Sequence, residues 1–389
     1  MKKNPLFPVL LVNFFVQAFV AVFFLFPAAL QAQGVLLSRI GWIMSSFNIA
    51  STIARPLGGS FSEKAGVRKT LLVSSFLLVL FSVPLVWIRG FPAIVITRVL
   101  MGISFSVAMV AVSSYQALMI PLEKRGSAYA WIGAAYALPQ LTVFPLGDFF
   151  LSGGGYVPFV LLAPLMALLC LVSSWQLPSP RDQAGSCDEK GKKRPSWGKW
   201  SDLLSVKGFW VLQINVFLFA FVNSAALQFM PAYLHTQGLV ASSFFIANAG
   251  MAMVLRIVAS RIMDHLDRKI IMGFATAWMG VVMVFLVMAQ TNFLVFMEGA
   301  VYGIGMGFGF PVMLALMPDI FPDELKPKGI STSFFVMDLG FIVSPVVLGY
   351  LGNIAGLGIT LQLIGMTGFL GGVLLYFQGW RPLSRLNRP

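Results

Sequence analysis

Two short stretches of the sequence are almost the same: PAALQAQG at residues 27–34 and PAYLHTQG at residues 231–238. Each ends the first apolar run of one half of the chain, and the two copies lie 204 positions apart. More pairs recur at an offset of 201: Arg55 with Arg256, Glu63 with Asp264, Gly102-Ile103 with Gly303-Ile304, and Pro121 with Pro322. The chain is therefore two copies of one unit.

The composition is that of a membrane protein. Of the 389 residues, 58% are hydrophobic and 11% are charged, and the mean hydropathy is +0.85. Apolar runs of about 18 to 25 residues, each long enough to cross a bilayer as a helix, follow one another almost without pause. No stretch alternates with the period of two that a membrane barrel requires. The runs begin near Leu6, Ile40, Thr70, Phe91, Gly126, Tyr156, Gly208, Ser242, Ile270, Asn292, Gly329 and Gly358.

These twelve runs predict an all-α integral membrane protein with twelve transmembrane helices in two pseudo-symmetric six-helix bundles. The longest polar interruption covers residues 176–206, so we expect bundles at residues 1–175 and 207–389 joined by a basic linker. Within the linker, Trp197–Leu204 has two tryptophans and two leucines among charged residues. This pattern fits a short amphipathic helix on the membrane surface or a plain tether.

The basic excess is a topology signal. With an inside N-terminus and twelve spans, 22 of the 27 Lys and Arg residues fall in inside segments, which places both termini in the cytoplasm by the positive-inside rule. We expect a multi-pass protein of the cell (inner) membrane, with anionic lipids at the cytoplasmic face as partners and no nucleic acid. The two cysteines, Cys170 and Cys187, indicate neither a disulfide framework nor a metal site.

Three segments carry a family resemblance. GGSFSEKAGVRK, residues 58–69, resembles the signature loop between spans 2 and 3 of the major facilitator superfamily. SRIMDHLDRK, residues 260–269, is a more diverged second copy of this segment. RVLMG, residues 98–102, resembles the span 4 motif of that family. The sequence departs from the pattern at Glu63, where Asp is usual, at Val67, where a base is common, and at Asp267, where the first copy has Gly. The resemblance covers essentially the whole chain and implies two bundles that rock around a central site.

The resemblance also implies a cytoplasmic gate. The basic side chains of the signature loop would reach carboxylates or helix ends of the opposite half, while the glycines permit a tight turn and close helix approach. The alternative is that these bases only anchor the inside face. The expected gate residues are Arg55, Gly59, Glu63, Gly66, Arg68, Lys69, Arg256, Asp264 and Arg268.

Ionisable side chains inside membrane spans are costly and are functional candidates. Arg98, Glu298 and Asp338 are the clearest cases, and Asp338 lies near the midplane of its span. Burial disfavours a charged carboxyl, so Asp338 is the first candidate for proton coupling. Glu298 and Arg98 occupy almost matching places in the two halves and are the next candidates, either as an ion pair that breaks during transport or separately. Static structural pairing is the alternative for all three.

Neutral polar residues within the spans predict a substrate cavity. Asn13 and Gln17 are four residues apart and share one helix face. In the family, spans 1, 4, 7 and 10 line the cavity. Interhelical hydrogen bonds are the rival explanation for each residue. The candidate cavity residues are Asn13, Gln17, Tyr136, Gln140, Asn215 and Asn223.

The function that these features favour is secondary active transport, with proton-coupled export of a small organic drug or metabolite as the first hypothesis. The drug and metabolite exporter branch resembles this chain in its length and short loops. Uptake of a small organic acid or sugar, flipping of a lipid-linked substrate, and a channel are the alternatives. No phosphate-binding loop or metal cluster is present in the sequence, which argues against an enzyme. We expect a monomer without cofactors that draws its energy from the proton gradient.

Overall fold

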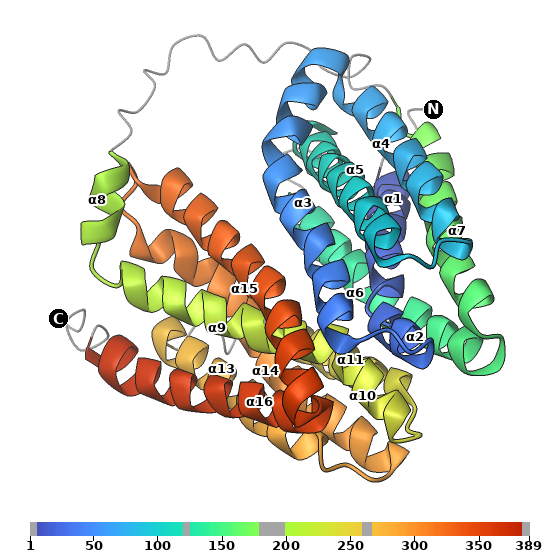
Figure 1. The fold of residues 1–389 in the computed structure, drawn as a ribbon. Helices are drawn as coiled ribbons and strands as arrows, with labels where there is room; N and C mark the ends of the chain where they lie inside the picture. Colours follow the sequence, from blue (N-terminus) through green and yellow to red (C-terminus); the bar gives the residue numbers. More distant parts are fainter. Residues whose placement is uncertain (1–5, 120–124, 179–198, 259–266, 383–389) are drawn as a thin grey trace. The chain divides into compact units, whose positions relative to one another are not determined.

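The structure is a computed structural model that describes residues 6–119, 125–178, 199–258 and 267–382 (Figure 1). The chain divides into two compact units. One contains residues 1–35 and 42–190, and the other contains residues 36–41 and 191–389. Every regular element in the described residues is helical, as expected.

The N-terminal unit contains seven α-helices and one 3-10 turn among its described residues. They are α1 (Leu6–Val22), α2 (Phe26–Ala32), α3 (Leu37–Ala65), α4 (Val67–Ser82), η1 (Val83–Val86), α5 (Phe91–Met119), α6 (Arg125–Gly153) and α7 (Tyr156–Trp175). The first residues of α3 are grouped with the other unit. α1 with α2, and α4 with η1, each form one long apolar stretch, so that six long stretches result.

The C-terminal unit has the same order of helices after one short helix. Its described elements are α8 (Trp200–Ser205), α9 (Phe209–Gln228), α10 (Met230–Thr236), α11 (Ala241–Val258), α13 (Arg268–Leu286), α14 (Asn292–Ile320), α15 (Lys326–Ala355), α16 (Leu357–Leu374) and the π-helical turn η4 (Leu375–Trp380). Of the twelve long stretches in the described parts of both units, nine are long and apolar enough to cross a membrane. α3, α6 and α11 are the other three.

The repeated eight-residue stretches fold alike. Pro27 and Pro231 lie in the first turns of α2 and α10, where the missing N–H of proline costs no helical hydrogen bond. Gly34 and Gly238 follow these helices with φ of +76° and +69°, a conformation that glycine adopts without strain. In each unit a proline therefore restarts the first span and a glycine ends it.

The internal repeat also appears as a repeated helix contact. A Cβ atom on Gly102 of α5 would lie 2.4 Å from the backbone oxygen of Phe47 on α3. A Cβ atom on Gly303 of α14 would lie 2.6 Å from the backbone oxygen of Asn248 on α11. Both partners of the second pair are 201 positions beyond those of the first. The same crossing is thus built twice, and the sequence repeat is confirmed as a structural one.

The segment before the second bundle contains a short helix, α8. A helix in this place was one of the two interpretations of Trp197–Leu204 in the linker. Asp202 accepts a hydrogen bond from the backbone N–H of Lys199 and fixes the start of α8. Leu203 is buried, whereas Trp200 and Leu204 are exposed. α8 therefore buries one apolar side chain and leaves two facing outward.

Candidate functional site

Arg98 is buried within the N-terminal unit among aromatic rings. Its guanidinium carbon lies 4.4 Å from the ring centroids of both Phe23 and Phe47, and 6.0 Å from that of Phe26. The side chain is 2% exposed, and Nε and Nη1 have no hydrogen-bond partner among the described residues. Cation–π attraction at desolvated sites is worth about 2 kcal/mol or more and offsets part of the cost of burial. We call Arg98 with these three rings the aromatic cage.

The same unit buries an acid that the sequence analysis did not select. Asp148 lies five residues before the end of α6 and is 3% exposed. The sequence contained a signal for it, because Asp148 is an acidic residue within the apolar stretch VFPLGDFFL, residues 143–151. The criterion that singled out Arg98 applies to it equally.

Two of the expected cavity residues meet in the N-terminal unit. Gln17 and Tyr136 share a side-chain hydrogen bond, and Gln17 Nε2 lies 3.4 Å from Sδ of Met109. Gln17 therefore joins α1, α5 and α6. Asn13 is buried and donates to the carbonyl of Val9 in its own helix at 2.9 Å.

Gln140 is half-buried one turn after Tyr136 on α6. Like the other expected cavity residues, it stays a prediction as a substrate contact.

Asp338 lies in the interior of the C-terminal unit. It is 9% exposed and stands 12 residues after the start of α15, about 18 Å along the helix. Two residues later, a Cβ atom on Gly340 would lie 2.9 Å from the backbone nitrogen of Phe221. Asp338 thus lies two residues from a close approach of α15 to α9.

Glu298 and Tyr302 are one turn apart on α14. Glu298 is half-buried, and its Oε2 is screened from solvent without a hydrogen-bond partner among the residues that the structure describes. Tyr302 is fully buried, and its ring centroid lies 5.4 Å from that of Phe244. Its hydroxyl has no hydrogen-bond partner in the part of the chain that the structure describes. This part of α14 therefore carries polar atoms that the surrounding structure leaves unsatisfied.

The expected cavity residues of α9 are both buried. Asn215 accepts a hydrogen bond from Thr276 Oγ1 of α13 at 3.0 Å, which is the interhelical bond that the sequence left open as a rival explanation. Asn223 is 6% exposed, and its Oδ1 has no hydrogen-bond partner. Gln213, which was not selected, donates to Ser333 Oγ of α15 at 2.9 Å.

The signature loop of the N-terminal unit is shorter than expected, because α3 continues to Ala65 and α4 begins at Val67. The turn is Gly66 alone, with φ of +87°. Close helix approach was expected at Gly59, but a Cβ atom there would meet open space. The tight position is Gly58, where a Cβ atom would lie 2.8 Å from Cβ of Val110. We call the end of each unit that carries its signature segment the signature end.

Arg68 has a partner within its own unit. Its Nη2 donates to the backbone oxygen of Trp175 at 2.8 Å, at the last residue of α7. A cation is favourable at a helix C-terminus, where carbonyl oxygens lack helical partners. Tyr115 donates to the carbonyl of Pro178 at 2.8 Å, so two side chains hold the chain where it leaves the bundle. Arg55, Glu63 and Lys69 are exposed.

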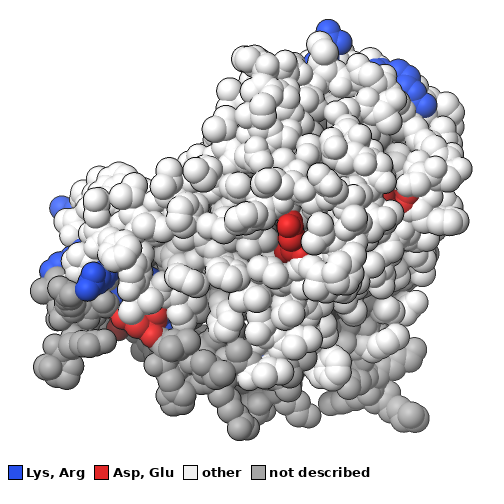
Figure 2. All heavy atoms as spheres, turned by 90° about the horizontal axis from the view of Figure 1, so that it is seen from below, with Lys and Arg blue, Asp and Glu red and all other residues white. Residues whose placement is uncertain are grey.

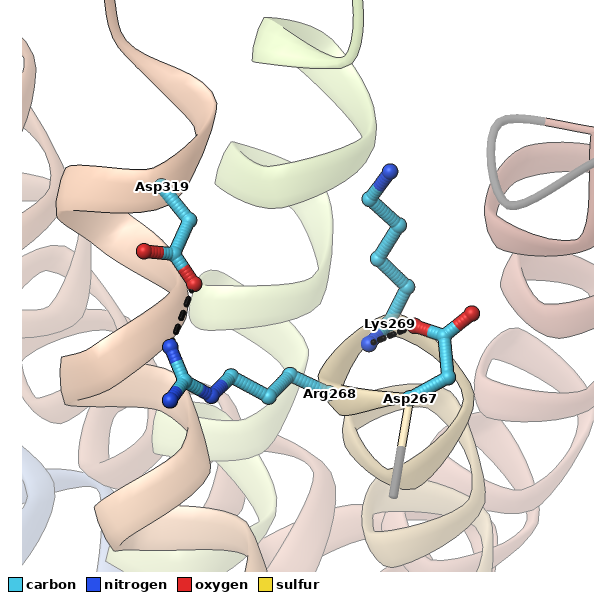
Figure 3. A network of polar contacts seen from close by, with 4 residues as sticks. All are labelled: Asp267, Arg268, Lys269 and Asp319. Atoms are coloured by element: carbon cyan, nitrogen blue, oxygen red, sulfur yellow. Dashed lines mark hydrogen bonds and ion pairs between the residues drawn. The ribbon is translucent and has the colours of Figure 1, made fainter. Parts of the chain in front are cut away.

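The signature end of the C-terminal unit is built differently (Figure 3). Arg268, at the start of α13, forms an ion pair of 2.6 Å with Asp319 near the end of α14. Asp267 caps α13 by accepting from the backbone N–H of Lys269 at 3.0 Å. Arg256 on α11 lies 5.9 Å from the ring of Phe310. Asp264 lies outside the described residues.

Charged groups are sparse on the surface. Figure 2 shows a face that is mostly uncharged, with small separate groups of Lys, Arg, Asp and Glu. Large apolar side chains are instead exposed along most of the long helices, among them Phe76, Phe149 and Phe274. Such a surface suits lipid, and two repeated six-helix units with charges inside their spans define a membrane transporter.

The comparisons with known proteins agree with this class. The family model for the Major Facilitator Superfamily matches residues 6–268 and 234–389. The chain belongs to the major facilitator superfamily.

Relatives differ in what they carry. The D-xylose transporter of Levilactobacillus brevis is 22% identical over 348 residues, covering 76% of this chain and 73% of that protein. Multidrug resistance protein 1 of Bacillus subtilis is 25% identical over 271 residues, covering 69% of this chain and 68% of that protein. A solved D-xylose-proton symporter has the same fold, with a TM-score of 0.73 at 18% identity over 96% of this chain and 98% of that one. The chain is thus a secondary transporter and no enzyme, and its relatives include both a D-xylose transporter and a multidrug resistance protein.

Proposed function

We propose that the protein exports a small organic molecule across the inner membrane in exchange for protons. The observation that carries the proposal is Asp338, an acid buried about 18 Å along a membrane helix. An ionisable group within a membrane span is costly to place there and is a functional candidate, which supports this role for Asp338. Asp338 would take up a proton from one side of the membrane and release it to the other as the units rock.

The remaining ionisable groups extend this mechanism. Glu298 serves as a second proton acceptor, and its unsatisfied Oε2 supports that role. Arg98 keeps a fixed positive charge inside the N-terminal unit. The signature ends face the cytoplasm, and their bases exchange partners during the cycle. In the described conformation, Arg68 is bound to the end of α7 and Arg268 to Asp319.

One observation favours a second function, proton-coupled uptake of a small organic acid or sugar. The aromatic cage leaves Nε and Nη1 of Arg98 without hydrogen-bond partners, as an anion-binding guanidinium would be before its ligand arrives. The similarity to a D-xylose transporter supports uptake of a sugar in the same way. The first experiment therefore has to distinguish export from uptake and to identify the class of compound that is transported.

The experiment uses everted membrane vesicles and a pH-sensitive dye. Vesicles with the wild-type chain are energised, and tetraphenylphosphonium, benzoate and D-xylose are added in turn. Asp338→Asn is the test variant. Asp323→Asn is the matched control, because Asp323 is an exposed aspartate outside the spans whose pKa is lowered by its hydrogen bond from Lys326.

Export by proton exchange predicts that one compound discharges the gradient in wild type and Asp323→Asn but not in Asp338→Asn. Symport predicts no discharge in everted vesicles and proton uptake with substrate in right-side-out vesicles. An equal response of Asp338→Asn and wild type would contradict coupling at Asp338.

A further inference from the structure

An apolar groove of about 460 Å³ lies on the N-terminal unit near its signature end. Its walls come from α3, α4 and α5. Phe61 and Val73 line it and are about half exposed, so the groove is open at the surface. The lining residues are Phe61, Ala65, Lys69, Thr70, Val73, Ser74, Leu77, Ile103, Ser104 and Val107.

The hydroxyl groups in this groove are already satisfied. Thr70 donates to the carbonyl of Gly66 at 3.1 Å, Ser74 to that of Leu71 at 3.1 Å, and Ser104 to that of Leu100 at 2.9 Å. Each bond lies within the residue's own helix or first turn. The floor therefore offers no free hydroxyl donor to a polar ligand, and its chemistry suits a hydrocarbon chain.

The groove has charge at one end only. Lys69 lines the groove three residues after the Gly66 turn. Lys64 is exposed two residues before that turn. A hydrocarbon-lined groove with an ammonium group at its end matches a molecule that has an apolar chain and an anionic head. In a membrane that molecule is a phospholipid.

A second apolar groove, of about 470 Å³, continues along α3 and α5. Both grooves are lined by Ile103, and together they follow α3 from Trp42 to Ala65. That is about 35 Å of helix, close to the thickness of a bilayer core. The second groove has no charged lining residue. The charged end thus lies where the head group of a lipid in one leaflet belongs, and the part of the grooves next to it lies where the chains of that lipid belong.

We propose that the groove at Lys69 binds one anionic phospholipid, with the phosphate at Lys69 and an acyl chain between α3, α4 and α5. The proposal goes beyond the transport function and does not depend on which substrate is carried. One lysine near an anionic lipid surface is worth about a fivefold change in affinity.

The test is native mass spectrometry of the full chain in detergent, titrated with phosphatidylglycerol and, separately, with phosphatidylethanolamine. Lys69→Gln removes the proposed head-group contact, and Lys69→Arg keeps the charge. Lys64→Gln is the matched control, because it removes a nearby exposed lysine that does not line the groove. Val73→Trp fills the groove, and Leu80→Trp adds the same ring at an exposed position of α4 outside it.

We expect wild type to prefer phosphatidylglycerol, with about fivefold weaker binding in Lys69→Gln and near-normal binding in Lys69→Arg and Lys64→Gln. Val73→Trp should weaken binding of both lipids, and Leu80→Trp should not. Equal binding of the two lipids by wild type, or equal losses in Lys69→Gln and Lys64→Gln, would overturn the proposal. All variants are compared only as monodisperse protein with wild-type helical content.

Discussion

The two units keep the same backbone crossing and differ in the side chains placed beside it. Gly102 meets Phe47 in one unit as Gly303 meets Asn248 in the other. One turn earlier the units diverge. Arg98 has Gly299 as its counterpart at the 201-residue offset, and a Cβ atom on Gly299 would lie 2.6 Å from the backbone oxygen of Phe244.

The difference shows which parts of the repeat are fixed. Gly102 and Gly303 are glycine at corresponding positions of the two copies, because any side chain there would separate the helices of the shared crossing. Positions beside them have diverged: the N-terminal unit holds a cation in the aromatic cage, whereas the C-terminal unit has Glu298 and Tyr302 on α14. The buried Arg98 of the N-terminal unit therefore corresponds to Gly299 in the C-terminal unit, next to the half-buried Glu298.

The largest expected effect comes from breaking the shared crossing. Gly102→Ala and Gly303→Ala place a Cβ atom 2.4 and 2.6 Å from a facing backbone oxygen. Each should destabilise the protein by about 1–3 kcal/mol or more, because neither backbone can move aside freely. Gly59→Ala is the control and should be neutral or stabilising by up to about 1 kcal/mol, because its Cβ meets open space in a helix. Thermal unfolding of the purified protein measures all three, and equal melting temperatures would refute the shared crossing.

The second prediction concerns the aromatic cage, where we expect a substitution to change transport much more than stability. Arg98→Leu removes a buried cation and keeps an apolar side chain among Phe23, Phe26 and Phe47. We expect transport to fall at least about tenfold, while stability changes by about 1 kcal/mol or less, since the lost cation–π attraction is offset by the lost cost of burial. Vesicle transport and thermal unfolding of the same preparation check this. Transport at the wild-type rate by Arg98→Leu would show that the aromatic cage has only a structural role.

A smaller effect concerns the unsatisfied hydroxyl of Tyr302. Its counterpart in the N-terminal unit is Met101, which is also fully buried and has no polar hydrogen-bonding group of this kind. Tyr302→Phe should stabilise the protein by about 1 kcal/mol, because it removes a buried hydroxyl without a hydrogen-bond partner. A loss of stability on thermal unfolding would show that the hydroxyl is bonded after all.

The smallest effect is expected at the signature end of the C-terminal unit. Arg268 and Asp319 are 37% and 48% exposed, so solvent screens their ion pair. A double-mutant cycle with Arg268→Ala and Asp319→Ala should give a coupling energy of about 0.2–1 kcal/mol, and added salt should reduce it. A coupling above about 2 kcal/mol would show that the pair is shielded from water.

The features that could be predicted from the sequence are those that depend on a periodic pattern of residues. The twelve long helices and the internal repeat follow from apolar run length and a fixed offset, whereas the family follows from the resemblance of residues 58–69, 260–269 and 98–102 to its motifs. The membrane orientation follows from charge placement and stays a prediction. Asp148 was missed although the rule for charges within spans covers it.

Other features depend on which face of a helix meets which neighbour. Phe23, Phe26 and Phe47 are three of 36 phenylalanines, and only folding brings them around one guanidinium. Pattern likewise could not separate Gly58, which is tightly packed, from Gly59, which is not. The partner of Arg68 is a backbone oxygen at the end of α7, and a carbonyl carries no sequence signal.

The central claim is that Asp338 couples transport to protons, and comparing exchange with accumulation tests it most directly. Proteoliposomes containing wild type or Asp338→Asn are loaded with the compound that responds in the vesicle screen. Equilibrium exchange of labelled compound needs only that the units rock, whereas accumulation also needs coupling to an imposed pH gradient. We predict that Asp338→Asn keeps exchange and loses accumulation. Accumulation at the wild-type level by this variant would contradict the account.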